Sequence, residues 1–327
     1  MQDSGLGHPP VKPDYGSLGS ASDLQSNRPV VPRSSGWRSF LAVIIGVAVA
    51  LPFVLAGPVR AAWTEIGHFL SLHGKAVSAS PAILSRHETE SLDKTSAQKQ
   101  ASLLLERAIN HYEGAADEIA GRVDSWRGKL KLTPQMNSLV TTGLNSNDLR
   151  VRAAAIEVDL AATNTPKTSE SFDHLVMQAQ AGQKATKIWA LWTMGLLANR
   201  GVETSRATES LIGYLRDSDP EVRHWAVEGL AYIGSNETIA PLLQTLHDDV
   251  SPMVRERAAC SLAQSGMLNE QQRRSVIPRL LDFAEDSSLD VQTHAWVFHA
   301  LRDITAQNLP DDAAAWRNWY SGTNAGN

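Results

Sequence analysis

The feature that most constrains the fold is a short pattern that occurs twice, 32 residues apart. Each copy places a proline, a valine followed by an arginine, an alanine, a leucine and a glycine at the same spacings. A period of this size is typical of a solenoid of helix pairs, in which neighbouring units bury one another's apolar faces. The two copies are Pro220, Val222, Arg223, Ala226, Leu230, Gly234 and Pro252, Val254, Arg255, Ala258, Leu262, Gly266.

Weaker versions of the pattern continue on both sides and predict an all-α solenoid of about five helix pairs between residues 133 and 305. The first helices are predicted at about 134–144, 169–181, 203–216, 236–247 and 270–284. The second helices are predicted at about 148–162, 184–199, 220–233, 252–265 and 289–304.

The second helices share an aligned dipeptide and an alanine four residues after its first member. The small alanine lets neighbouring second helices approach closely where they cross. The dipeptides are Val151-Arg152, Thr186-Lys187, Val222-Arg223, Val254-Arg255 and Val291-Gln292, and the alanines are Ala155, Ala190, Ala226, Ala258 and Ala295. Asp148, Asp219, Ser251 and Asp290 stand where a side chain would cap each second helix.

Both ends of the solenoid are expected to be covered, because an open end would expose its core. At the N-terminal end, apolar residues of the range 97–132 recur at alternating spacings of four and three, which predicts one long amphipathic helix. Self-association as a coiled coil is the other use of such a stripe. At the C-terminal end, a short helix within 306–327 places Trp316 and Trp319 on one side.

The N-terminal part is predicted to anchor the chain in a membrane. Residues 39–59 carry no charge, and a helix of this length reaches about 31 Å, the hydrocarbon thickness of a bilayer. We therefore expect a transmembrane helix over 38–60. A disordered tail rich in Ser, Pro and Gly precedes it over 1–37, and a linker or stalk follows over 61–96.

A cleaved signal peptide and a buried core helix are the alternatives to this spanning helix. The long polar segment before the span favours an uncleaved signal anchor. More basic residues precede the span than follow it, which predicts a cytoplasmic N-terminus and a periplasmic or otherwise extracytoplasmic repeat domain. They are Arg28, Arg33 and Arg38 before the span, and Arg60 and Lys75 after it.

The third and fourth pairs resemble HEAT repeats of the short type found in phycobilisome lyase subunits and deoxyhypusine hydroxylase. The resemblance is carried by residues 238–246, Thr-Ile-Ala-Pro-Leu-Leu-Gln-Thr-Leu, and by Pro252-Met253-Val254-Arg255. More weakly, it extends from Pro134 to Thr305. It implies stacked helix pairs whose second helices line a concave binding face.

The same resemblance raises the alternative of an enzyme or enzyme subunit of lyase or oxidoreductase type. Hydroxylase members hold iron on repeated His-Glu dipeptides. The matching region here has His224-Trp225 and His294-Ala295, and the only His-Glu, His87-Glu88, lies outside the repeats. We therefore predict no catalytic residue, metal site or cofactor. The single cysteine, Cys260, excludes an intramolecular disulfide.

The favoured function is a membrane-anchored, non-catalytic scaffold that binds a protein or peptide partner. A net charge of −5 gives no reason to expect nucleic acid, whose binding needs a concentrated basic surface. The aligned basic residues are expected to pair with acidic residues of the adjacent repeat, such as Asp219 or Glu221. The candidate partner-binding residues on the concave face are Arg223, Trp225, Arg255, Arg257 and His294.

Overall fold

The computed structural model describes residues 82–324. The predicted tail (1–37), the predicted transmembrane helix (38–60) and the stalk up to residue 81 lie outside the described residues. Within the described part, no helix is both long and apolar enough to cross a bilayer. The described residues from Ile83 onward belong to one compact unit.

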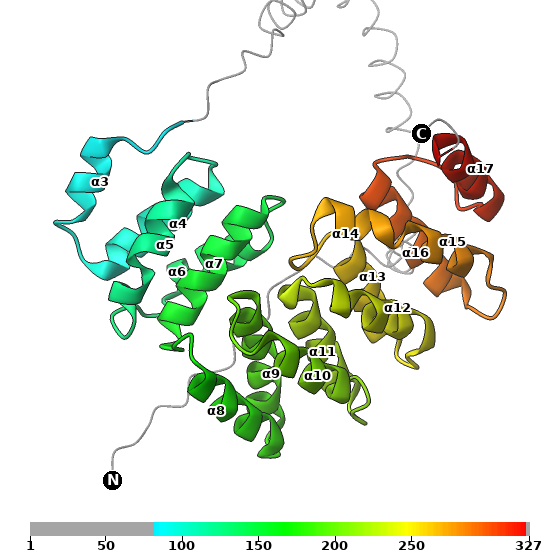
Figure 1. Ribbon diagram of the computed structural model, residues 1–327, viewed down its shortest axis with the longest axis horizontal. Coiled ribbons are helices and arrows are strands. Elements are labelled where there is room, and N and C mark those ends of the chain that lie inside the picture. The colour runs from blue at the N-terminus through cyan, green and yellow to red at the C-terminus, as the bar shows by residue number, and fades with distance from the viewer. Residues whose placement is uncertain (1–81, 325–327) are drawn as a thin grey trace, which may run out of the picture. The chain divides into compact units, whose positions relative to one another are not determined.

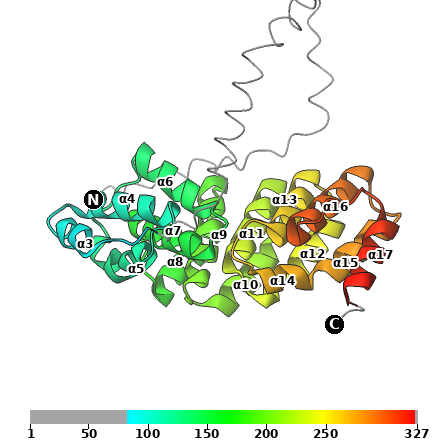
Figure 2. The ribbon, with the colours of Figure 1, turned by 90° about the horizontal axis from the view of Figure 1, so that it is seen from above.

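The described chain is helical, and its only β feature is one isolated bridge between Ile83 and Glu113. Helix pairs follow one another from α6 to α16 (Figures 1 and 2). The first helices are α6 (Pro134–Leu144), α8 (Ser169–Gln180), α10 (Thr204–Tyr214), α12 (Ile239–Asp248, after the short helix η1, Asn236–Thr238) and α14 with α15 (Glu270–Ser275 and Ile277–Glu285). The second helices are α7 (Leu149–Ala162), α9 (Lys184–Asn199), α11 (Pro220–Ile233), α13 (Pro252–Ala263) and α16 (Val291–Thr305).

At the N-terminal end of the solenoid, the prediction of one long helix over 97–132 was wrong. After α3 (Arg86–Leu92), the chain forms two helices, α4 (Ala97–Ile109) and α5 (Ala115–Trp126). His111 and Gly114 between them have φ angles of 56° and 86°, in the left-handed region that breaks a helix and that glycine tolerates. The apolar stripe therefore folds into a hairpin, and its two helices pack against α6 and α7.

The C-terminal end is covered less completely. The last helix, α17 (Ala313–Asn324), packs against the first helix α15 and places Trp316 in the core, fully buried. Trp316 and Trp319 meet edge to face with ring centroids 5.8 Å apart. Among the described residues, α16 packs against α13, α14 and α15, and no further second helix covers its other side, so part of α16 faces outward.

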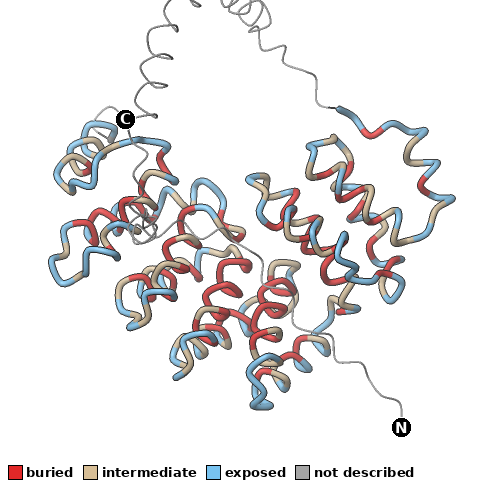
Figure 3. The backbone as a smooth tube through the Cα atoms, turned by 180° about the vertical axis from the view of Figure 1, so that it is seen from behind, coloured by how far each residue is buried: buried red, intermediate tan, exposed pale blue. Residues whose placement is uncertain are grey.

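The second helices form the more deeply buried row (Figure 3). Four of the five predicted crossing alanines are completely buried, as close packing requires: Ala155, Ala190, Ala226 and Ala258. The fifth prediction was wrong, because Ala295 is exposed. Asp290 caps α16, so counting from the cap places Thr293 and Val297 at the positions of Val254 and Ala258. Both Thr293 and Val297 are fully buried.

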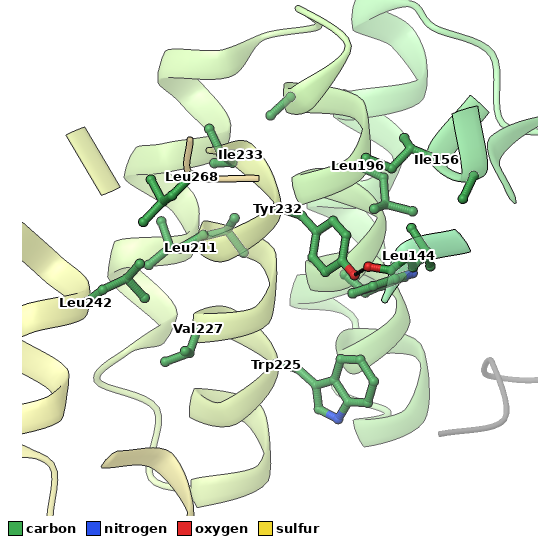
Figure 4. Packing of buried hydrophobic residues seen from close by; sticks show 14 of the residues in the cluster. Leu144, Ile156, Leu196, Leu211, Trp225, Val227, Tyr232, Ile233, Leu242 and Leu268 are labelled. Carbon is green, nitrogen blue, oxygen red and sulfur yellow. Dashed lines mark hydrogen bonds between the residues drawn. The ribbon is translucent and has the colours of Figure 1, made fainter. Parts of the chain in front are cut away.

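The helices α9 and α11 approach each other closely at a point where two glycines face each other. A β-carbon built on Gly195 would lie 2.7 Å from the Cα of Gly229, closer than any real contact. Just beside this crossing, Trp192 meets Tyr232 edge to face at 4.6 Å, and the Tyr232 hydroxyl donates to the Leu144 carbonyl at 3.2 Å (Figure 4). The first and third helix pairs are thereby joined inside the core.

This crossing gives a prediction for stability. Gly195→Ala should lower the free energy of unfolding by about 2–3 kcal/mol, because the new methyl group forces α9 and α11 apart. Gly213→Ala is the matched control, since nothing lies within 4 Å of its added carbon. We expect this control to raise stability by about 0.5–1 kcal/mol through helix propensity. Urea unfolding of both variants would measure the difference, and equal midpoints would contradict the close approach.

Candidate functional site

One position on every second helix, the fourth after the cap, carries a basic side chain or a histidine. At three of these positions the side chain reaches the loop before the next second helix. Lys187 Nζ lies 3.1 Å from Asp217 Oδ2. Arg223 donates to both oxygens of Asp249 at 2.8 Å. The full set, which we call the basic ladder, is Arg152, Lys187, Arg223, Arg255 and His294.

Arg255 makes the same kind of contact with the last pair. Its guanidinium donates to Asp290 at 2.6 Å and to the Thr293 hydroxyl at 2.9 Å. The backbone amide of Thr293 is the main cause that holds the pKa of Asp290 below its usual value. The predicted cross-repeat pairing is therefore present, although its carboxylates are not the expected Asp219 and Glu221. Those two lie 2.8 and 2.5 Å from Lys184.

The ladder arginines also bind the loop of their own repeat. Arg223 Nη1 donates to the Asp217 carbonyl at 3.0 Å, and Arg255 Nη1 donates to the Asp249 carbonyl at 2.7 Å. Each guanidinium thus joins two consecutive loops. The side chains of Arg223 and Asp249 are 9% and 6% exposed, so this pair is shielded from water.

Arg152 contacts a different part of the chain, and the sequence before α9 explains why. The acidic ladder partners Asp217 and Asp249 stand two residues before a cap, and the matching position before α9 is Ala181. Arg152 instead donates to the carbonyls of Gln264, at 2.8 Å, and Gly266. These carbonyls follow α13, three helix pairs further along. The side chain therefore ties the first pair to the fourth.

The predicted partner-binding residues divide by burial. Arg223, Trp225 and Arg257 are each less than 9% exposed, whereas Arg255 and His294 are half-buried. The ladder brings Arg223, Arg255 and His294 to equivalent positions. Trp225 instead packs edge to face on Trp192 at 5.9 Å. The role of this set in binding stays a prediction, and its least buried members are Arg255, whose side chain is 11% exposed, and His294.

Arg257 belongs to a set of buried charges on the second helices. Its Nε lies 2.8 Å from Glu228 Oε1, within ion-pair distance. Burial raises the pKa of Glu228, and Arg257 opposes this shift. On α7, burial raises the pKa of Asp159 to about 7 despite a hydrogen bond from Trp192. Such carboxyls keep a proton more readily than exposed ones.

Exposed apolar side chains gather at the N-terminal ends of α13 and α16. Val250 is 86% exposed, Val291 is 87% exposed and Met253 is 42% exposed. These two helix ends lie side by side, because Arg255 on α13 contacts the cap of α16. We call the surface formed by Val250, Met253, Arg255, Val291 and His294 the α13–α16 edge. The exposure of these valines was not predicted, because Val291 was aligned with the buried Val254.

No arrangement for metal chemistry is present in residues 82–324, where no group of three or more His, Cys, Asp or Glu side chains converges. Cys260 is half-buried, and burial raises the pKa of its thiol, which lowers its reactivity at neutral pH.

The most regular repeats of the chain are similar to a known family of helical repeats. Residues 172–263 match the family model of HEAT repeats. The match covers α8 to α13, where the ladder is most regular, and its description names neither the lyase nor the hydroxylase type. No curated protein matches the chain. Among solved structures, a designed armadillo repeat protein in complex with the peptide (KR)4 is similar, with 20% identity and a TM-score of 0.31, covering 67% of this chain and 94% of that chain.

Proposed function

We propose that this protein is a membrane-anchored HEAT-type scaffold that binds a protein partner at the α13–α16 edge. One observation carries the proposal. Of the six large hydrophobic side chains that are exposed in the described residues, three lie at this edge: Val250, Met253 and Val291. Gathered exposed apolar side chains are a common mark of a protein-binding surface.

The charges at the edge indicate what the partner should carry. His294 holds the ladder position of the last pair, and no carboxylate contacts it within residues 82–324. Every ladder position from Lys187 to Arg255 contacts an aspartate. A partner segment with apolar side chains and a carboxylate would extend this series by one step, with its acid beside His294.

The proposed anchor rests on the sequence of residues 39–59, whose uncharged length suits one bilayer span. Arg28, Arg33 and Arg38 before the span favour a cytoplasmic N-terminus. In this arrangement the repeat domain lies outside the cytoplasm and presents the α13–α16 edge to partners near the membrane surface.

Photocrosslinking in living cells tests the partner site. The photoreactive residue p-benzoylphenylalanine replaces Val250 or Val291 in the full chain, one position at a time. We expect both positions to give an adduct with the same partner protein, identified by mass spectrometry, because both side chains belong to one surface. His294→Ala in the same chain should weaken that adduct.

Met177 is the matched control position, because its side chain is 59% exposed but lies on α8, away from the edge. The crosslinker at Met177 should give no such adduct. Adducts that are equally strong from Met177, or absent from both valine positions, would remove the assignment of the α13–α16 edge.

A fusion to the C-terminus tests the proposed orientation. An alkaline phosphatase domain, which becomes active only outside the cytoplasm, should be active when it follows Asn327 in the full chain. Deleting residues 39–59 should abolish this activity, because the chain then has no export segment. An inactive fusion in the intact chain would overturn the orientation and leave the helical fold untouched.

A further inference from the structure

The imidazole of His247 lies between two aspartates that belong to different helix pairs. Its Nε2 lies 2.9 Å from Asp286 Oδ2, and its Nδ1 is within hydrogen-bond distance of Asp248 Oδ1. Asp248 is the last residue of α12, in the fourth helix pair, and Asp286 directly follows α15, in the fifth. We call these two contacts the histidine bridge. The side chain of His247, which is 28% exposed, therefore joins two consecutive pairs outside the basic ladder.

Both contacts of the histidine bridge can be hydrogen bonds only while the imidazole is protonated. An ionised carboxylate accepts hydrogen bonds and donates none, and a neutral imidazole has one N–H where the imidazolium has two. The hydrogen bond to His247 and two from Ser288 lower the pKa of Asp286, so this partner is ionised at neutral pH. When the imidazole loses its proton, one ring nitrogen therefore faces a carboxylate oxygen with no hydrogen between them.

The histidine bridge joins the two loops that carry the α13–α16 edge. The loop of residues 249–251 contains Val250, and the loop of residues 286–290 leads directly into Val291. Arg255 connects the same loops at a second point, because it donates to a carbonyl of the first and to a carboxylate of the second. An arginine stays charged throughout the accessible pH range, whereas a histidine changes its charge near neutral pH. The bridge is therefore the one of these two connections that can titrate.

The two aspartates are the charges that act on this imidazole. Phe283 of α15 packs against the ring with centroids 4.9 Å apart, and Arg279 lies on the same Phe283, 5.0 Å from its centroid. Hydrogen bonds with Asp286 and then Asp248 raise the pKa of His247, and burial opposes them. Charged side chains of the surrounding elements form ion pairs of their own: Arg279–Asp282 on α15, Arg223–Asp249 from α11, Arg255–Asp290 from α13 and Arg317–Glu285 from α17.

We propose that His247 is a protonation-dependent clamp: its imidazolium holds the loops 249–251 and 286–290 together, and loss of the proton loosens them. Because the folded-state pKa of His247 is raised, the contribution of the clamp is complete below about pH 6.5 and is lost as the pH rises through that raised value. The loops position Val250 and Val291, so the clamp regulates the α13–α16 edge. Only this regulation rests on the proposed function, whereas the clamp itself does not.

Amide hydrogen exchange, measured by mass spectrometry on the full chain in neutral detergent, tests the clamp without a partner. At about pH 6, where the imidazole is charged, the His247→Gln variant should exchange the amides of 249–251 and 286–290 about three- to tenfold faster than the wild-type chain, because a charge-assisted hydrogen bond is lost. At about pH 9 the two chains should exchange at equal rates, because the wild-type imidazole is then neutral like the glutamine side chain. Comparing both chains at the same pH cancels the intrinsic pH dependence of exchange.

His299→Gln is the matched control variant. His299 lies 3.4 Å from Asp303 on its own helix α16, so this pair joins no loops. The control should leave the exchange of both loops unchanged at either pH. Asp286→Asn is the second variant of the clamp, because it removes the charge of the main partner and keeps the size of the side chain. It should give the same faster exchange at the lower pH, and it decides the question if His247→Gln does not fold.

A ratio of variant to wild-type exchange that is the same at both pH values would reveal a merely structural contact and overturn the clamp. Unchanged exchange in both clamp variants would also overturn it. Crosslinking from p-benzoylphenylalanine at Val250 in isolated membranes then tests the regulation. The adduct should be stronger at about pH 6 than at about pH 9, and His247→Gln should remove this difference.

The two proposals fail in different ways. An adduct of equal strength at both pH values would overturn the regulation and leave the partner edge in place. The absence of any adduct would remove the partner edge and with it the regulation, while the exchange rates would still decide the clamp.

Discussion

The guanidinium of Arg223, held between two consecutive loops, is the interaction on which the regular part of this structure depends. It donates to both oxygens of Asp249 and to the carbonyl of Asp217, so one side chain fixes the spacing of two repeats. In a nearly dry setting such a pair adds little net stability over apolar packing, but removing one partner leaves a buried charge and costs about 3–5 kcal/mol. We infer that the ladder selects one stacking register among several that apolar packing alone would allow.

Departures from this interaction account for the irregular parts. Ala181 stands where an acidic partner would be, and Arg152 bonds instead to carbonyls at the end of α13. Arg152 thereby links the first helix pair to the fourth. At the other end, His294 has the ladder position of the last helix pair, and its imidazole is half-buried.

Most features that a few consecutive residues determine were predicted correctly from the sequence. Features that depend on packing between helices were not. Asp148, Asp219 and Asp290 cap their helices as predicted, because capping involves only the next few residues. The fourth predicted cap was wrong, because the Ser251 side chain makes no capping hydrogen bond. The prediction of a single helix over 97–132 was wrong. An apolar stripe with heptad spacing is equally compatible with the two helices of a hairpin, and Gly114 lies where the chain reverses between them. Val291 was predicted to be buried because it was aligned with the buried Val254. Counting from the helix cap places Thr293 at that position instead.

The candidate site was the least predictable part. Burial of Trp225 and Arg257 and exposure of Val250 depend on which surfaces the stack covers, and no local pattern encodes that. Only the missing acid at Ala181 hinted that Arg152 would act outside the ladder.

The most direct measurement is a double-mutant cycle on the stability of the full chain with Arg223→Ala and Asp249→Ala. If this pair sets the register, each single variant should lose about 3–5 kcal/mol of unfolding free energy. The double variant should then lose less than the sum, with a coupling energy of about 2 kcal/mol. A coupling energy near zero would show that apolar packing alone sets the stack and would contradict the account.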